Sequence, residues 1–268
     1  MSTSEEQATP TAAGIYDAVM GGTANTAADR AYADQLCAIE PLVPEMAWAN
    51  RGFLQRVVHW MVSEAGIDQI VDVGSGLPTV QNTHDIAGPD CRVVYVDHDP
   101  EVVRRSGSLL EGHPNTSCIQ WDITKPGLLE HEHLRSVIDF DRPVGLLIVG
   151  VMYFVSDEDG PHDAVRHLVA GLPEGSYLAL SHLISDRQSE ERIAQAKAVY
   201  ANARQQLHLR TFAEVREFFT GLRFIRPNPT AAAELNYIGL WGADDPAEAD
   251  DDSSRWFAAG VGQVPGRA

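Results

Sequence analysis

Short apolar runs alternate with amphipathic stretches along most of the chain. Aliphatic and β-branched residues dominate the runs, which predict strands at residues 70–73, 92–96, 117–121, 144–149 and 176–183. Apolar positions with helical spacing lie between them, at residues 79–87, 100–110 and 157–172. Strands that alternate with helices predict βαβ crossovers and a mostly parallel sheet with helices on both faces.

Helical patterns also flank this core. Residues 45–65 form a long amphipathic pattern, and two shorter helices are predicted within residues 14–36. Residues 189–207 predict another helix, and Thr211 with Glu214 forms a capping box that opens the next one. Residues 224–226 and 235–241 resemble two strands with no helix between them, which favours an antiparallel pair at the end of the sheet.

Composition limits the classes of partner. The 268 residues, 44% of them hydrophobic, suffice for one large α/β domain. The formal net charge of −18 argues against nucleic acid and anionic membranes, which require basic surfaces, and leaves a small molecule or a peptide as the substrate. The sequence has no long apolar run and begins with an acidic, polar stretch, so we expect a cytoplasmic protein. The three cysteines are widely spaced and predict neither disulfides nor a metal site.

The first predicted strand ends in the turn Gly74-Ser75-Gly76. Glycine turns that open a helix bring backbone amides close to an anion, either a phosphate or a carboxylate. Thr79 occupies the position where a dinucleotide site favours a third small residue. Asp72 suits a cofactor that carries an amine as well as a carboxylate, and S-adenosylmethionine has both groups.

Acidic residues follow the next two strands. Asp97 lies 21 residues beyond Gly76, close to the roughly 20 expected of an acid that binds a ribose diol. Helix capping is the other role for such an acid, and Asp99 fits it better because it directly precedes Pro100. His98 is a candidate to lie along an adenine ring.

With these motifs, the chain resembles the class I S-adenosylmethionine-dependent methyltransferases. More narrowly, it is similar to a bacterial family of S-adenosyl methyltransferases of unknown substrate, formerly a domain of unknown function. The similar stretches include Asn50-Arg51-Gly52-Phe53-Leu54, residues 72–79, residues 94–100 and residues 176–182. The resemblance implies a Rossmann-like, seven-stranded, mostly parallel sheet.

The same resemblance implies roles for further residues. The Asp122 carboxylate would receive the adenine amino group and Ile123 would supply a backbone amide, although Asp122 also suits a simple turn. A backbone carbonyl at Gly150 or Val151 would receive the cofactor amine. Arg51 and Arg30 are candidates for the cofactor carboxylate, with surface ion pairing as the alternative.

On the acceptor side, Tyr153, Phe154 and Tyr16 are candidates to face a substrate. His182 ends the fifth strand at the same edge and is the candidate general base, because its ordinary pKa suits proton removal near neutrality. His131-Glu132-His133 does not suggest a metal site, since residues two apart diverge on a helix.

These inferences divide the chain into four parts. We expect a disordered tail at 1–13, a helical lid at 14–44, a catalytic core at 45–243 and an acidic, solvated segment at 244–268. The expected activity is methyl transfer from S-adenosylmethionine to an O or N atom of a small molecule, with S-adenosylhomocysteine as product. A non-catalytic protein that binds these cofactors, and a nicotinamide-dependent oxidoreductase, remain as alternatives.

Overall fold

The fold is described from a computed structural model, which covers residues 9–77, 81–186, 188–201 and 205–266. The strands are β1 Gln69–Val73, β2 Arg92–Asp97, β3 Thr116–Gln120, β4 Gly145–Val149, β5 Tyr177–Leu183, β6 Arg223–Phe224, β7 Asn236–Tyr237 and β8 Phe257–Gln263. The α-helices are α1 Ala12–Val19, α2 Ala27–Ile39, α3 Val43–Ser63, α4 Thr83–Ala87, α5 Pro100–Leu109, α6 Glu132–Val137, α7 Pro161–Ala170, α8 Glu190–Tyr200, α9 Phe212–Glu217 and α10 Pro246–Ala249. Short 3₁₀ helices are η1 Leu128–Glu130, η2 Met152–Phe154, η3 Asp157–Asp159 and η4 Ser254–Trp256.

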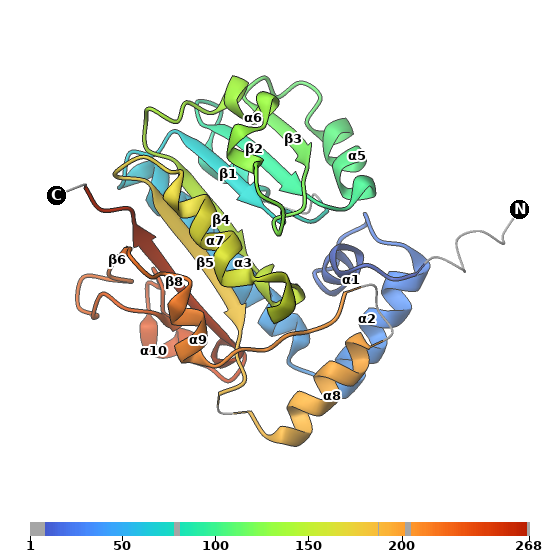
Figure 1. The fold of residues 1–268 in the computed structure, drawn as a ribbon. Helices are drawn as coiled ribbons and strands as arrows, with labels where there is room; N and C mark the ends of the chain where they lie inside the picture. The colour runs from blue at the N-terminus through green and yellow to red at the C-terminus, as the bar shows by residue number, and fades with distance from the viewer. Residues whose placement is uncertain (1–8, 78–80, 187, 202–204, 267–268) are drawn as a thin grey trace, which may run out of the picture.

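The strands form one sheet in the order β3-β2-β1-β4-β5-β8-β6, with β7 pairing beside β8 (Figure 1). Strands β1 to β5 are mutually parallel, as their alternation with helices predicts. Because their carboxyl ends meet at one edge, the loops that follow them converge there. The predicted fold class is therefore confirmed.

Side-chain alternation divides the core between the two faces of the sheet. Val71 and Val73 of β1 pack with α6, α7 and α9 on one face, whereas Ile70 packs with Phe53, Val57 and other apolar residues of α3 on the opposite face. Figure 1 shows α7 in front of β4 and β5, with α3 behind them. All five residues of β1 are buried, so this strand is the centre of the core.

The antiparallel end of the sheet differs from the expectation. The segments predicted at 224–226 and 235–241 contribute only the two-residue strands β6 and β7, and both pair with β8 rather than with each other. Strand β8 lies inside the segment predicted as a solvated acidic tail, and it pairs with the full length of β5.

The composition of β8 explains why its sequence pattern is weak. It contains Ala258, Ala259, Gly260 and Gly262 instead of large apolar residues. Side chains of Phe219, Leu222, Phe224 and Leu235 crowd the two glycines, leaving 2.9–3.3 Å to the position that a Cβ would occupy. Small residues are therefore required there, and the core extends well past residue 243.

Other boundaries differ by local amounts. The helix predicted at 79–87 is α4, which begins at Thr83, and its predicted start at 78–80 lies outside the described residues. The helix predicted at 189–207 ends at Tyr200, ahead of the undescribed residues 202–204. Residues 1–8 of the predicted disordered tail also lie outside the described part, and α1 already begins at Ala12, capped by Thr11. No helix among the described ranges is long and apolar enough to cross a bilayer.

A truncation tests the structural role of β8. Removal of residues 257–268 takes away the antiparallel partner of β5 and uncovers buried residues of both core clusters. We expect this variant to lose cooperative thermal unfolding, followed by circular dichroism, whereas removal of residues 267–268 alone leaves the transition unchanged. A cooperative transition in the longer truncation within a few degrees of the full chain contradicts this prediction.

Candidate functional site

The chain turns sharply directly after β1. Gly74 and Gly76 have φ angles of 72° and 67°, in the left-handed region that glycine enters without strain. The Gly74 N–H donates to the Val96 carbonyl at 2.7 Å, which ties the turn to the end of β2. A Cβ on Gly74 would lie 2.3 Å from Cγ2 of Val151, so the backbone there has no space for a side chain.

Asp97 ends β2 beside this turn and is almost fully buried. Its Oδ2 accepts a hydrogen bond from the Gly76 N–H at 2.9 Å, and its Oδ1 accepts one from the Asp99 N–H at 2.9 Å. The two amides fix the plane of the carboxylate and leave each oxygen a further lone pair. His98 Nδ1 is 3.5 Å from Oδ1, and this contact raises the pKa of the imidazole. Asp99 caps α5 by accepting the Glu101 N–H, as its position before Pro100 predicts.

Asp72 lies on β1 and is buried next to the turn. Its Oδ2 accepts a hydrogen bond from Thr83 Oγ1 at 2.6 Å. Burial raises the pKa of Asp72 to about 6, and the Thr83 hydrogen bond and the Arg51 charge oppose that effect. Ionisation of this buried carboxyl group near neutral pH therefore lowers the stability of the folded protein.

Asp122 and Ile123 follow β3 on the adjacent wall. Asp122 Oδ1 accepts the N–H and the Oγ1–H of Thr124, at 2.9 and 2.8 Å, in a local turn. The turn role that the sequence left open is thus present, at a position that also lines the cavity.

The loop after β4 is held against α3. Gly150 has a φ of 74°, and a Cβ there would lie 2.9 Å from Nδ2 of Asn50. Asn50 is buried, and its Oδ1 accepts a hydrogen bond from Ser181 Oγ at 2.6 Å. Helix α3 is thereby joined to β5 at the point where the loop passes.

The N-terminal helices close the side of the site. The Tyr16 hydroxyl on α1 donates to the Ala47 carbonyl of α3 at 3.0 Å, and the Arg51 guanidinium lies 5.8 Å from the centre of its ring. Asp29 of α2 is buried and accepts the Thr11 N–H at 2.9 Å, which joins the two helices. Arg30, the other predicted carboxylate ligand, instead donates to Asn25 and does not line the cavity.

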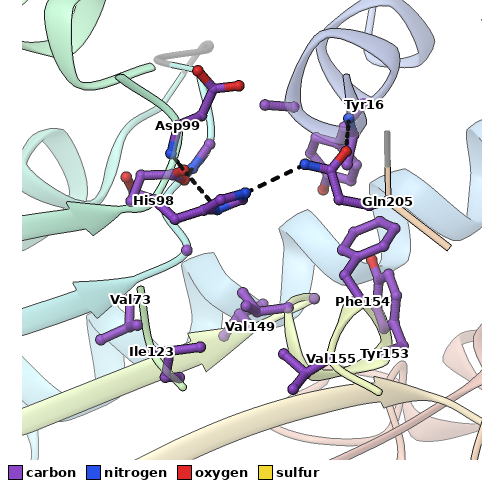
Figure 2. A pocket seen from close by; sticks show the side chains of 18 of the residues that line it. Tyr16, Val73, His98, Asp99, Ile123, Val149, Tyr153, Phe154, Val155 and Gln205 are labelled. Carbon is purple, nitrogen blue, oxygen red and sulfur yellow. Dashed lines mark hydrogen bonds and ion pairs between the residues drawn. The ribbon is translucent and has the colours of Figure 1, made fainter. Parts of the chain in front are cut away.

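These elements enclose a cavity of about 380 Å³ (Figure 2). Fourteen of the sixteen predicted site residues line it: Tyr16, Arg51, Asp72, Gly74, Ser75, Gly76, Asp97, His98, Asp122, Ile123, Gly150, Val151, Tyr153 and Phe154. The fold thus brings together residues from widely separated parts of the chain.

His182, like Arg30, lies outside this lining, and the structure gives it a different role. It is fully buried and does not line the cavity. Its Nδ1 lies 2.6 Å from the Leu183 carbonyl, which only accepts, and its Nε2 lies 2.8 Å from Arg210 Nη1, which only donates. The neutral imidazole with its proton on Nδ1 satisfies both partners, whereas a second proton would face the guanidinium. Burial is the main cause that lowers its pKa to about 3, so His182 does not serve as a base for a substrate.

Arg210 explains what this histidine does. Its guanidinium is buried and donates to the carbonyls of Met152 and Val155, at 2.9 and 3.0 Å, and to Asp157 at 2.6 Å. Arg210 and His182 therefore position η2, the segment that carries Tyr153 and Phe154 into the cavity.

Several cavity residues carry no predicted role. The sequence contains only a weak indication of a role for Asn50, which is a polar residue on the apolar face of a predicted helix. The sequence contains no indication of a role for Tyr200 and Gln205, because they belong to α8 and the connection after it, far in sequence from every motif. Gln205 Oε1 accepts the Ala12 N–H at 3.2 Å, and its Nε2 lies 3.4 Å from His98 Nε2, so its side chain spans the cavity between α1 and β2 (Figure 2).

Comparison with known proteins places this site in a family. Residues 2–265 match the sequence profile of the family described as S-adenosyl methyltransferase. The chain belongs to this family. In this member of the S-adenosyl methyltransferase family, the glycine turn, Asp97 and Asp122 line one cavity of a class I methyltransferase fold.

Two solved structures resemble the whole chain. A candidate methyltransferase from Thermobifida fusca YX is 35% identical, with a TM-score of 0.88, over 98% of each chain. A member of a domain-of-unknown-function family from Streptomyces avermitilis MA-4680 is 34% identical, with a TM-score of 0.88, over 97% of this chain and 100% of the other. A comparison with curated proteins gives no match.

The buried histidine makes the stability of the protein sensitive to acid. The unfolded chain protonates His182 near pH 6.5, whereas the folded protein does so only near pH 3. The buried neutral His182 therefore makes its full contribution to stability above pH 6.5, and this contribution is lost as the pH falls from 6.5 towards 3. We expect His182→Gln to be less stable than the wild type by about 1–3 kcal/mol at pH 8, from lost packing and hydrogen bonding, and by a smaller difference at pH 5. Urea denaturation at both pH values measures it, and a difference that does not shrink contradicts the assignment.

The contribution of Asp72 to stability depends on pH in the direction opposite to that of His182. Its folded pKa of about 6 lies above the model-peptide value of 3.8, so its favourable contribution exists below pH 3.8 and is lost as the pH rises through 6. Asp72→Asn removes the buried charge, and we expect it to raise the free energy of unfolding at pH 8 by about 1–3 kcal/mol, with little gain at pH 4. Denaturation midpoints at pH 4, 6 and 8 test this expectation, and a variant that is less stable than the wild type at pH 8 contradicts it.

Proposed function

We propose that this protein binds S-adenosylmethionine in the cavity and transfers its methyl group to an O or N atom of a small molecule. The observation that carries the proposal is the Asp97 carboxylate, held by two backbone amides beside the glycine turn at the carboxyl edge of the sheet. Two oriented oxygens match the two hydroxyls of a ribose, and the family assignment supplies the cofactor class.

The described residues fit this cofactor. The Ser75 hydroxyl is buried in the glycine turn and has no hydrogen-bond partner among the described residues, so the turn holds a polar group that a ligand would satisfy. Beside Gly76, the nearest atom of the described residues to a Cβ position is 3.9 Å away, so a ligand has space to approach the turn there. Arg51 supplies a positive charge between Asp72 and Tyr16.

Each part of the cofactor then has a candidate partner. The amides of the turn already donate to Val96 and Asp97, so its Ser75 hydroxyl, together with Arg51, would hold the methionine carboxylate. The carbonyl of Gly150 or Val151 would receive the amine. Asp97 would bind the ribose, His98 would lie along the adenine, and Asp122 with Ile123 would bind the adenine edge. The bound cofactor supplies an electrophilic methyl group on a sulfonium.

The protein's own contribution is positioning. The close turns after β1 and β4, the fixed Asp97 plane and the η2 segment locked by Arg210 hold the groups that would surround the reacting atoms. Holding two reactants in near-attack geometry is sufficient to accelerate such a transfer strongly. Helices α1 and α2, within the expected lid, would exclude water.

Parallel calorimetric titrations test the cofactor. We expect micromolar binding of S-adenosylmethionine and S-adenosylhomocysteine and no binding of NAD. Turnover across an acceptor panel then separates an enzyme from a protein that only binds the cofactor. Binding of NAD alone, or of none of the three ligands, overturns the proposal.

Asp97→Asn tests the ribose assignment. The substitution removes the charge and replaces one acceptor oxygen by a donor, so we expect affinity for S-adenosylmethionine to fall by about tenfold to a hundredfold. The matched control is Asp90→Asn, an exposed acid outside the cavity lining, which should bind the cofactor as the wild type does. Thermal unfolding verifies that both variants are folded, and unchanged affinity in a folded Asp97→Asn variant refutes the assignment.

A further inference from the structure

One end of the cavity is walled by aromatic rings from three separate elements. They are Tyr16 of α1, Tyr153 and Phe154 of η2, and Tyr200 of α8, here called the aromatic chamber. The ring of Phe154 lies 4.6 Å from that of Tyr153 and 5.9 Å from that of Tyr200, measured between centroids. Figure 2 shows Tyr16, Tyr153 and Phe154 on one side of the pocket, with His98 and Asp99 on the other. The chamber therefore lies apart from the acids proposed to bind the nucleoside.

The charges around the chamber do not favour an anion. Among the described lining residues, the basic side chains are Arg51, His98 and Lys125. His98 contacts Asp97 and Lys125 follows the Asp122 turn, while Arg51 is assigned to the cofactor carboxylate. The formal net charge of −18 adds to the penalty for a negatively charged acceptor. Among the described residues, an acceptor in the chamber thus meets aromatic faces, with Arg51 assigned to the cofactor.

The lining also includes Asp159, an acid on η3, which closely follows η2 in the chain. Asp159 of η3 is exposed, and its Oδ2 accepts a hydrogen bond from Ser156 Oγ at 2.6 Å. A carboxylate there repels an anionic acceptor and suits a group that donates hydrogen bonds or releases a proton.

The buried groups of the chamber are poor bases. Burial raises the pKa values of Tyr16, Tyr153 and Tyr200, so these hydroxyls stay protonated at neutral pH. The nearby His182 is enclosed by Arg210 and the Leu183 carbonyl. A hydroxyl acceptor must usually lose its proton to attack well, whereas a neutral amine already presents a lone pair.

We propose that the acceptor is a small planar molecule without negative charge, stacked within the aromatic chamber, and that its nucleophile is the neutral exocyclic nitrogen of an aromatic amine. This inference rests on the proposed function. The nitrogen lone pair forms the new N–CH₃ bond while the S–CH₃ bond of S-adenosylmethionine breaks and its electron pair stays on sulfur, giving S-adenosylhomocysteine. The nitrogen then releases its proton to water beside Asp159.

The cavity volume limits the size of this acceptor. About 380 Å³ is near the lower end of the roughly 300–1,000 Å³ typical of ligand pockets. The cofactor and the acceptor share this space, so the acceptor must be small.

Three quinolines that differ in one substituent test the inference on the full chain. Aminoquinoline, hydroxyquinoline and quinoline carboxylate are titrated by calorimetry into protein saturated with S-adenosylhomocysteine, so this readout does not require turnover. Methylation by S-adenosylmethionine is then followed by mass spectrometry. We expect the amine and the hydroxyl compound to bind with similar affinity, the carboxylate to bind at least tenfold more weakly, and only the amine to be methylated.

Phe154→Ala locates the binding to the chamber. We expect the variant to bind aminoquinoline about tenfold more weakly because a stacking partner is lost, with affinity for S-adenosylhomocysteine within about twofold of the wild type. The control is Trp48→Ala, which removes an aromatic ring of α3 that is 52% exposed and outside the cavity lining. It should leave both affinities unchanged.

The outcomes separate the inference from the proposed function. Tightest binding of the carboxylate, binding of none of the three quinolines, faster methylation of the hydroxyl compound, or unchanged amine affinity in Phe154→Ala overturns the acceptor class. Failure to bind S-adenosylhomocysteine at all overturns the proposed function itself.

Discussion

The close approach of two backbone turns is the constraint on which the cavity depends. Strands β1 and β4 pair in parallel, so the turns that follow them leave the sheet side by side. At Gly74 the space is so limited that a Cβ would lie 2.3 Å from the Val151 side chain. The floor of the cavity is therefore backbone rather than side chain, and hydrogen bonds from the Gly74 and Gly76 amides to Val96 and Asp97 hold it in place. Asp72, which precedes this floor, is buried at a cost in stability.

Buried polar groups hold the remaining walls in place. Asn50 and Ser181 join α3 to β5, and Arg210 joins η2 to the same strand through His182. Each such bond is favoured because a buried polar group without a partner is costly. These contacts connect the cofactor side of the cavity with the aromatic side, so neither wall is independent of the core.

Local patterns explain why much of the fold and of the cofactor side was predictable. Apolar runs gave the five parallel strands, and the glycine turn and strand-end acids occupy fixed positions relative to those strands. Strand β8 was missed because packing against Phe219 and Leu222 requires alanine and glycine, which carry a weak strand signal, behind an acidic run. His182 was misassigned because neighbouring residues of a strand face opposite sides: Ser181 contacts α3, while His182 stacks on Phe218 of the other core cluster.

The sequence by itself determined the class of fold and the edge of the sheet where the predicted site residues gather, because both follow from short segments whose geometry is local. Only the tertiary structure decided the aromatic chamber, the isolation of His182 and the placement of Gln205 across the cavity. The physical reason is that these features depend on contacts between α1, η2 and the end of α8, which are distant in sequence. Their side chains come together only when the N-terminal helices and α8 pack beside the completed sheet (Figure 1).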